Sequence, residues 1–341
     1  MQDDKIEIRA LLQNELTEQF RALGLPAFRA AQVYRWMQRG AASFEEMTDI
    51  GKNLRTQLST LYRITPPTVQ RKQESELDGT VKYLWKLNDG NAVESVVMRY
   101  RYGNTVCISS QVGCRQGCVF CASTGLGFVR NLSAGEMLDE VYYSGRDSGT
   151  EITGIVLMGI GEPLENYDNV FRFLRLVNDA SGLNIGMRHI SLSTCGLVPG
   201  IQRLAEENLQ LTLSVSLHAP DDETRRKLMP IARTYSIAEL IQSCSDYYQK
   251  TGRRISFEYA LIKGVNDSPE QARLLAGLMR KVHGHVNLIP LNHVAGSPLE
   301  PGNLKEFTGR LQDLNCNVTV RRRLGADIDA ACGQLRRKEM K

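Results

Sequence analysis

Residues 105–121 read TVCISSQVGCRQGCVFC and decide how the rest of the chain can fold. The segment opens with TVCISS at 105–110, a run rich in β-branched and apolar residues that predicts a buried strand. Similar runs follow it, and the gaps between them carry apolar residues at helical spacing. Strands that alternate with helices predict a parallel sheet with right-handed crossovers. The further runs are ITGIVLM (152–158), HISLST (189–194), LTLSVSL (211–217), ISFEYALI (255–262) and HVNLIP (285–290).

Helical segments fill the gaps between these strands. Ser133 and Glu136 form a capping box at the start of one helix, and Ser-Pro-Glu at 268–270 begins another. Two more helices are predicted at 170–176 and 237–248. Six strand–helix units are too few for a complete eight-stranded barrel. We therefore expect an α/β fold, either a partial (β/α)6 barrel or an open doubly wound sheet, and periodicity alone does not choose between them.

The 341-residue chain has the composition of an ordinary globular protein, with 42% hydrophobic and 23% charged residues. This composition excludes fibrous and wholly disordered proteins. The net charge of +4 permits RNA binding without establishing it. The first residues lack the apolar segment of a secretory signal, and no apolar run reaches the ~18 residues of a membrane span. We therefore expect a cytoplasmic protein with no membrane partner, whose eight cysteines are reduced thiols, metal ligands or catalytic groups.

The spacing of apolar residues changes twice before the first predicted barrel strand. Residues 5–62 have helical spacing, whereas residues 82–100 alternate around an Asn-Asp-Gly-Asn turn, which predicts a β-hairpin. We divide the chain accordingly into an N-terminal helical module (1–75), a β-hairpin linker (76–104) and a core with a C-terminal extension (105–335).

The strongest local signal is the triplet Cys114, Cys118 and Cys121, directly after the first predicted strand. Three thiolates on one loop can hold three irons of a [4Fe-4S] cluster and leave the fourth iron open to another ligand. The alternatives are a zinc site or chance clustering. Structural zinc sites usually have four protein ligands in paired Cys-x-x-Cys units, and no second pair is present in this sequence. The triplet therefore favours the cluster over zinc.

Cys-x3-Cys-x2-Cys after the first strand resembles the signature of radical S-adenosylmethionine (SAM) enzymes. Further blocks resemble the RlmN/Cfr family of RNA methyltransferases, in the order in which that family carries them. They are SSQVGCRQGCVFCASTGLGFVRNLSAGE (109–136), LMGIGEPLENYDNV (157–170), ISLSTCG (190–196), SVSLHAP (214–220), NLIPLN (287–292) and GADIDAACGQL (325–335).

This resemblance implies the partial radical SAM barrel, preceded by a helix-hairpin-helix-like module that binds RNA. It also implies the activity of a 23S rRNA (adenine(2503)-C(2))-methyltransferase and tRNA (adenine(37)-C(2))-methyltransferase, EC 2.1.1.192. Such an enzyme methylates carbon 2 of adenine by a radical route, because that carbon is electrophilic and offers no nucleophile to the methyl group of SAM. The implied cofactors are a [4Fe-4S] cluster on Cys114, Cys118 and Cys121 and two molecules of SAM per turnover.

Polar residues at the carboxyl ends of the predicted strands match the SAM-binding positions of the family. Ligands of βα barrels bind at this end of the strands. Taken singly, most of these residues are more simply explained as turn formers or strand-end hydrogen-bond partners. The resemblance assigns SAM binding to Gly161, Glu162, Ser193, Ser216, Leu217, His218 and Asn292.

The resemblance assigns catalytic roles to residues outside the triplet. Cys332 accepts a methyl group from SAM and becomes the S-methylcysteine intermediate, which is then joined to the adenine. Cys107 resolves this protein–RNA adduct, which leaves a transient Cys107–Cys332 disulfide. Glu94 is the proton acceptor. Without the resemblance, Cys107 is a buried core thiol and Glu94 a solvent-facing carboxylate on an alternating strand.

The same resemblance implies 23S rRNA before full ribosome assembly and tRNA as partners, a flavodoxin-type electron donor, and a monomer. The nearest alternative within the family is methylation of carbon 8, which the Gly-Glu-Pro at 161–163 and NLIPLN at 287–292 disfavour. A non-catalytic iron–sulfur or zinc RNA-binding protein would not explain the SAM-binding strings or the isolated Cys332. Cys195, Cys244 and Cys316 match no functional position, and we expect them to be structural thiols.

Overall fold

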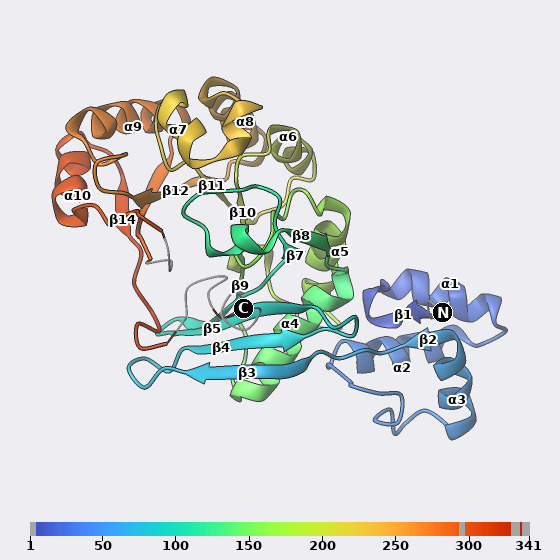
Figure 1. The fold of residues 1–341 in the computed structure, drawn as a ribbon. Helices are drawn as coiled ribbons and strands as arrows, with labels where there is room; N and C mark the ends of the chain where they lie inside the picture. The colour runs from blue at the N-terminus through green and yellow to red at the C-terminus, as the bar shows by residue number, and fades with distance from the viewer. Residues whose placement is uncertain (1–4, 293–296, 329–334, 336–341) are drawn as a thin grey trace.

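The computed structural model describes residues 5–292, 297–328 and Leu335, with Leu126 described by its backbone alone. A ten-stranded sheet forms its centre, in the order β14-β13-β12-β11-β10-β9-β6-β5-β4-β3 (Figure 1). The strands from β6 to β14 pair in parallel. They are β6 (Gly103–Cys107), β9 (Gly154–Leu157), β10 (Ile190–Thr194), β11 (Thr212–Ser216), β12 (Ser256–Leu261), β13 (His285–Pro290) and β14 (Val318–Val320).

All six predicted barrel strands are confirmed, and the short edge strand β14 was not predicted. In Figure 1 the helices α6 to α10 lie together on one side of the parallel strands, as in a barrel and not in a doubly wound sheet. The partial barrel is therefore the observed fold. These helices are α6 (Val198–Glu206), α7 (Asp222–Leu228), α8 (Ile237–Thr251), α9 (Pro269–Val282) and α10 (Leu304–Asp313).

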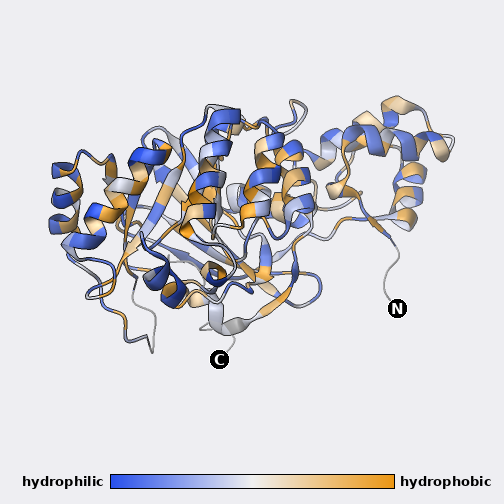
Figure 2. Ribbon diagram, turned by 90° about the horizontal axis from the view of Figure 1, so that it is seen from above, coloured by the Kyte–Doolittle hydropathy of each residue, from blue (hydrophilic) through white to orange (hydrophobic). Residues whose placement is uncertain are grey.

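The predicted helix starts are present with their caps. Helix α4 (Ala134–Ser148) begins with the capping box of Ser133 and Glu136, and Ser268 caps α9. Helix α5 (Tyr167–Val177) buries its apolar face, and Figure 2 shows hydrophilic residues on the outward sides of the helices. Short 3-10 helices are η1 (Ile8–Ala10), η2 (Ala122–Leu126), η3 (Met187–His189) and η4 (Pro230–Arg233). No helix of the described residues is long and apolar enough to cross a membrane.

The predicted hairpin extends the main sheet. Strands β4 (Val81–Lys86) and β5 (Ala92–Tyr100) pair antiparallel, β3 (Thr68–Glu74) joins the outer edge, and β5 pairs antiparallel with β6. Strand β3 was not predicted, because its residues are mostly exposed and lack apolar alternation. A separate small sheet pairs β7 (Gln111–Gly113) with β8 (Phe128–Asn131).

The N-terminal segment is helical, as expected, and closes with a short strand pair. It contains β1 (Ile6–Glu7), α1 (Gln13–Ala22), α2 (Ala27–Met37), α3 (Lys52–Leu61) and β2 (Tyr62–Arg63). Its buried side chains belong to the same continuous hydrophobic core as those of the barrel. The N-terminal segment is therefore packed against the barrel through a shared core.

A buried ion pair joins this segment to the barrel. Arg9 Nε lies 2.5 Å from Asp139 Oδ1 on α4, and both side chains are almost completely buried. The Arg9 guanidinium also donates to the carbonyl oxygens of Met37 at 2.9 Å and Ala41 at 2.6 Å. One side chain thus links η1, the end of α2 and the barrel helix α4.

We predict that Arg9→Met destabilises the fold by about 3–5 kcal/mol, because it leaves the Asp139 carboxylate buried without its partner. Urea denaturation of the cluster-free protein measures the effect. The matched control is Arg203→Met, which removes an ion pair to Asp168 whose side chains are 53% and 84% exposed. This control should cost less than about 1 kcal/mol. Equal effects of the two variants would contradict the linking role of Arg9.

Candidate functional site

The cysteine triplet lies on the loop between β7 and β8. Gly113 begins this loop with φ +82°, and a Cβ at this position would lie 1.7 Å from the carbonyl oxygen of Gly127. Only glycine permits this close approach of the two backbones. The loop places all three cysteines on the wall of one cavity of about 270 Å³: Cys114, Cys118 and Cys121.

The placement of these thiols fits an iron–sulfur cluster better than a single metal ion. Within the described parts of the chain, no three His, Cys, Asp or Glu side chains form a group that could hold one metal ion. In a cluster each thiolate binds a different iron, so ligands spread around a shared cavity are what it requires. Burial raises the pKa of Cys114 and Cys118, so these thiols need the positive charge of a metal to ionise.

The loop after β9 contributes Gly161 and Glu162 to the same cavity. Gly161 has φ +115°, and a Cβ there would lie 2.7 Å from Cβ of Gln111. The buried Glu162 carboxylate accepts the N–H groups of Leu164 at 3.0 Å and Cys195 at 2.7 Å. Burial raises the pKa of Glu162 and these hydrogen bonds oppose the shift. The carboxylate is thus fixed in orientation and keeps lone pairs for a ligand.

Serine side chains at the ends of neighbouring strands also line this cavity. Ser193 lies near the end of β10 and Ser216 at the end of β11. Leu217 follows in the chain, but it is completely buried in the core and is not among the residues that line the cavity. Any role of Leu217 in ligand binding must therefore come from its backbone.

His218 presents a neutral imidazole to the cavity. Its Nδ1 accepts the N–H of Ala260 at 2.9 Å, which assigns the ring proton to Nε2. Burial lowers the pKa of His218 to about 3. The residue also has φ +55°, and its ring packs 4.4 Å from that of Phe120 on the cysteine loop. His218 can therefore donate a hydrogen bond from Nε2 without carrying charge.

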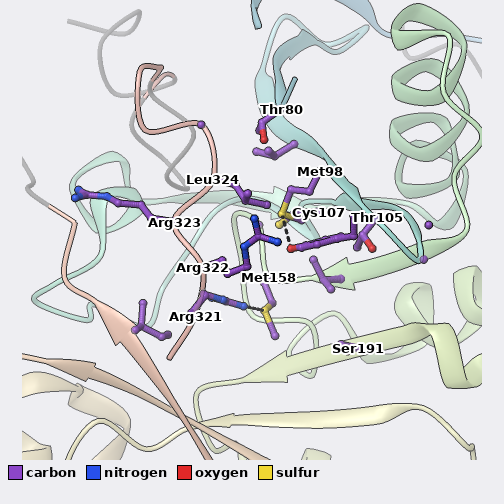
Figure 3. Close-up of a pocket in the computed structure, with 18 of the residues that line it drawn as sticks. Thr80, Met98, Thr105, Cys107, Met158, Ser191, Arg321, Arg322, Arg323 and Leu324 are labelled. Atoms are coloured by element: carbon purple, nitrogen blue, oxygen red, sulfur yellow. Dashed lines mark hydrogen bonds between the residues drawn. The ribbon is translucent and has the colours of Figure 1, made fainter. Parts of the chain in front are cut away.

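A second, larger cavity has a volume of about 840 Å³ (Figure 3) and adjoins the first, because the two share lining residues. Asn292, the last predicted SAM contact, lies on the walls of both cavities, as do Met158 and Arg321. The Nη2–H of Arg321 donates to Met158 Sδ at 2.8 Å. Figure 3 shows Arg321 and Met158 pointing toward each other in this shared wall. The larger cavity also contains the side chains of Glu94 and Cys107.

Glu94 is buried, which corrects the interpretation that it faces solvent. Its side chain is 2% exposed, and its Oε2 lies 2.9 Å from Nζ of Lys82, whose side chain has no exposed area. Both residues belong to the antiparallel strands β4 and β5, which are covered by other parts of the chain on both faces. The ammonium offsets the cost of burying the carboxylate beside the cavity.

Cys107 ends β6 and lies between Val96 of β5 and Val156 of β9 in the sheet. Burial raises the pKa of this thiol to about 11, and Arg321 is the main group that opposes the shift. Cys107, Arg321 and Arg322 line the same cavity (Figure 3). The thiol is therefore protonated at neutral pH in this state and has a cation nearby that favours its thiolate.

Cys332 lies outside the described residues. Before it in the chain, Ile328 lines the larger cavity, and after it Leu335 packs against Leu84 and Ala92 of the β4–β5 hairpin. Asp327 holds the preceding turn, since its carboxylate accepts hydrogen bonds from the Ser75 hydroxyl and from the N–H of Glu76.

The remaining thiols differ in their surroundings. Cys244 and Cys316 are buried in the main core, as expected for structural thiols. Cys195, by contrast, lines the cavity of the triplet, and its Sγ–H donates to Gln116 Oε1 at 3.4 Å. No disulfide is formed among the cysteines that the structure describes.

Sequence reasoning missed Lys82 and Glu258. The Asn-Asp-Gly-Asn turn fixes the hairpin register, in which Leu84 pairs with Glu94, so Lys82 is a diagonal neighbour of opposite charge. Glu258 is a lone acid in the apolar strand β12 and lines the triplet cavity, with burial raising its pKa. Charged residues are rarely buried without a partner, so an isolated acid in an apolar strand could have identified Glu258 as a candidate site residue.

Substituting Gly161 should disturb the cavity by steric conflict. We predict that Gly161→Ala destabilises the protein more than Gly90→Ala and weakens SAM binding to the cluster-loaded protein at least tenfold. Gly90 is the matched control, because it also has positive φ, +83°, but no atom within 4 Å of its added Cβ. Gly90→Ala should lower the free energy of unfolding only by the backbone strain of a positive φ, about 1–2 kcal/mol. Urea denaturation and equilibrium SAM binding test the pair, and identical results would show that Gly161 has no steric role.

Comparisons with known proteins agree with this geometry. The family model described as "Radical SAM superfamily" matches residues 108–276, and "Ribosomal RNA large subunit methyltransferase N-terminal domain" matches residues 6–64. The proteins called "Probable dual-specificity RNA methyltransferase RlmN" in Alkaliphilus oremlandii and Desulforamulus reducens are 50% and 51% identical, each over 340 residues. These matches cover 99% and 98% of this chain and 99% and 97% of the relatives.

Among solved structures, a radical SAM methyltransferase from Sphaerobacter thermophilus has a TM-score of 0.91 and 43% identity. The match covers 96% of this chain and 98% of that one. Identity of this extent, together with matches to both family models, leaves a single assignment. The chain belongs to the RlmN family of radical SAM methyltransferases.

Proposed function

We propose that this protein methylates carbon 2 of adenine in RNA, at adenine 2503 of 23S rRNA and adenine 37 of tRNAs, through an S-methylcysteine on Cys332. The observation that supports this proposal best is the contact between the two cavities. One cavity carries the cysteine triplet and the other carries Cys107 and Glu94, and they share Met158, Asn292 and Arg321. A cofactor bound at the triplet would thus lie next to a base bound in the larger cavity.

Cys114, Cys118 and Cys121 would hold a [4Fe-4S] cluster, whose open iron leaves room for SAM. When bound, these cofactors supply a methyl group and the one-electron chemistry that an electrophilic aromatic carbon requires. In this proposal Glu162 receives the ammonium group of SAM, and His218 donates from its neutral imidazole. Ser193, Ser216, the backbone of Leu217, Asn292 and Gly161 complete the SAM site.

Cys332, together with Cys107 and Glu94 of the larger cavity, carries out the remaining steps. Cys332 holds the methyl carbon that becomes bonded to adenine C2, so that protein and RNA are joined. Glu94 removes the proton from C2, and Lys82 stabilises the carboxylate until then. Cys107 loses its thiol proton and attacks Sγ of Cys332, so that the S–S bond forms as the C–S bond breaks. The product carbon takes the electron pair of the broken bond and one proton, which balances the proton lost from Cys107, and becomes the methyl group. The resulting Cys107–Cys332 disulfide is then reduced.

The target adenine must leave its base stack to enter such a cavity. This requirement supports action on 23S rRNA before full ribosome assembly and on exposed tRNA loops. We further propose that the N-terminal helices bind RNA, that a flavodoxin-type protein supplies electrons, and that the enzyme acts as a monomer in the cytoplasm. Methylation of carbon 8 remains the alternative outcome of the same site.

Replacing the resolving thiol should trap the joined state. We predict that Cys107→Ser, loaded with cluster and reduced in the presence of SAM and RNA, accumulates a covalent protein–RNA adduct. The serine hydroxyl cannot attack Cys332 Sγ to form a disulfide, so the C–S bond persists. A denaturing gel with labelled RNA measures the adduct.

The matched control is Cys244→Ser, which replaces a buried thiol away from both cavities and should turn over without an adduct. The adduct should also vanish when Cys107→Ser is combined with Cys332→Ala. Full turnover by Cys107→Ser, or an adduct that survives without Cys332, would exclude the assigned roles of the two thiols.

A further inference from the structure

Helix α7 places a completely buried guanidinium behind the cysteine-triplet cavity. Arg225 has no exposed area, and its Nη2–H groups donate to the carbonyl oxygens of Cys195 at 2.7 Å and Ser216 at 3.3 Å. Its Nε–H donates to the carbonyl oxygen of Leu217 at 3.2 Å. Cys195 and Ser216 both line the cavity. The guanidinium is therefore fixed against the backbone of the cavity wall.

The chain makes room for this side chain. Gly196 has φ +100°, and a Cβ at that position would lie 2.9 Å from Arg225 Nη2. Helix α7 also supports the cysteine loop directly, because the N–H of Val119 donates to the carbonyl oxygen of Leu228 at 3.0 Å. The side chain of Cys118 packs against the apolar cluster that contains Cys195 and Leu228. Arg225 and the triplet thus belong to one packed unit.

No acidic side chain of the described residues neutralises Arg225. It forms no salt bridge with any of them, and Nη1 has no hydrogen-bond partner in this part of the chain. Asp222, on the same helix, accepts the N–H of Ile237 instead. A buried charge with neutral partners alone is costly, so an anion in the functional state is expected to offset it.

The adjacent cavity provides that anion once its cluster is bound. Arg225 binds the carbonyl oxygen of Cys195, and the side chain of Cys118 packs against the same apolar cluster as Cys195, so the guanidinium lies directly behind the cavity that both residues line. A [4Fe-4S] cluster on three thiolates carries net negative charge, which increases by one when the cluster accepts an electron. A fixed cation in a low-dielectric environment stabilises the more negative state.

We propose that Arg225 is a positioning residue that raises the reduction potential of the cluster, because it holds beside the triplet a buried positive charge that no acidic side chain of the described residues pairs with. The cation lowers the free energy of the reduced cluster more than that of the oxidised cluster. It does not touch SAM or RNA, and it acts through the electrostatic potential at the triplet. This inference rests on the cluster site of the proposed function and does not depend on the RNA substrate.

Two substitutions at this position separate charge from hydrogen bonding. Arg225→Gln keeps an N–H donor for the carbonyl oxygens and removes the charge, whereas Arg225→Lys keeps the charge and loses the planar fork. The matched control is Arg226→Met, which removes an exposed charge from the next residue of α7. The readouts are the midpoint potential, from redox titration followed by electron paramagnetic resonance, and the iron content per chain.

We expect Arg225→Gln to lower the equilibrium constant for reduction of the cluster about tenfold. For a one-electron couple this corresponds to a midpoint potential that is ~59 mV more negative. Arg225→Lys should stay closer to the wild type, and Arg226→Met should match it, because water screens an exposed charge. Loss of iron from Arg225→Gln, with a wild-type midpoint potential for the cluster that remains, would overturn the proposal, because the charge would then act on cluster binding alone. Equal potentials and iron contents for Arg225→Gln and Arg225→Lys would overturn it. A wild-type protein that assembles no cluster would instead overturn the proposed function.

Discussion

Strand β6 is the point at which the ten-stranded sheet changes from antiparallel to parallel pairing. Its last residue, Cys107, therefore has the β4–β5 hairpin on one side and the first parallel barrel strand on the other. The hairpin brings Glu94, and the chain that continues beyond β6 forms the cysteine loop. The mixed pairing of one short strand thus places the larger cavity beside the cavity of the triplet. The proposed reaction depends on this adjacency.

Most of the barrel could be predicted from local sequence, because its strands are apolar runs and its helices carry their own caps. The burial of Glu94 and Lys82 could not be predicted. Alternating apolar and polar residues in β4 and β5 indicate one buried and one exposed face, whereas the structure covers both faces. The triplet was evident from spacing alone, whereas its cavity depends on Gly113, Gly161 and strand ends far apart in the sequence. Strands β3 and β14 lie at the edges of the sheet, where apolar patterning is weak.

Buried charges mark the positions at which this fold departs from an ordinary apolar core. Arg9 meets Asp139 between the N-terminal helices and the barrel, and Lys82 meets Glu94 beside the larger cavity. Arg225 meets only carbonyl oxygens among the described residues. The Arg9–Asp139 pair fixes the N-terminal segment to the barrel. Lys82, Glu94 and Arg225 lie next to the cavities in which the proposed reaction takes place. Charged side chains in a buried position lower stability, and they are expected at sites where function requires them.

The central claim is that the two adjoining cavities methylate adenine carbon 2 by way of Cys332. It is tested most directly by mass spectrometry and nuclear magnetic resonance of RNA nucleosides after reaction with SAM and reduced, cluster-loaded protein, for the wild type and Cys332→Ala. The account predicts 2-methyladenosine from the wild type and no methylated adenosine from Cys332→Ala. Methyl groups on carbon 8, or carbon 2 methylation by Cys332→Ala, would contradict it.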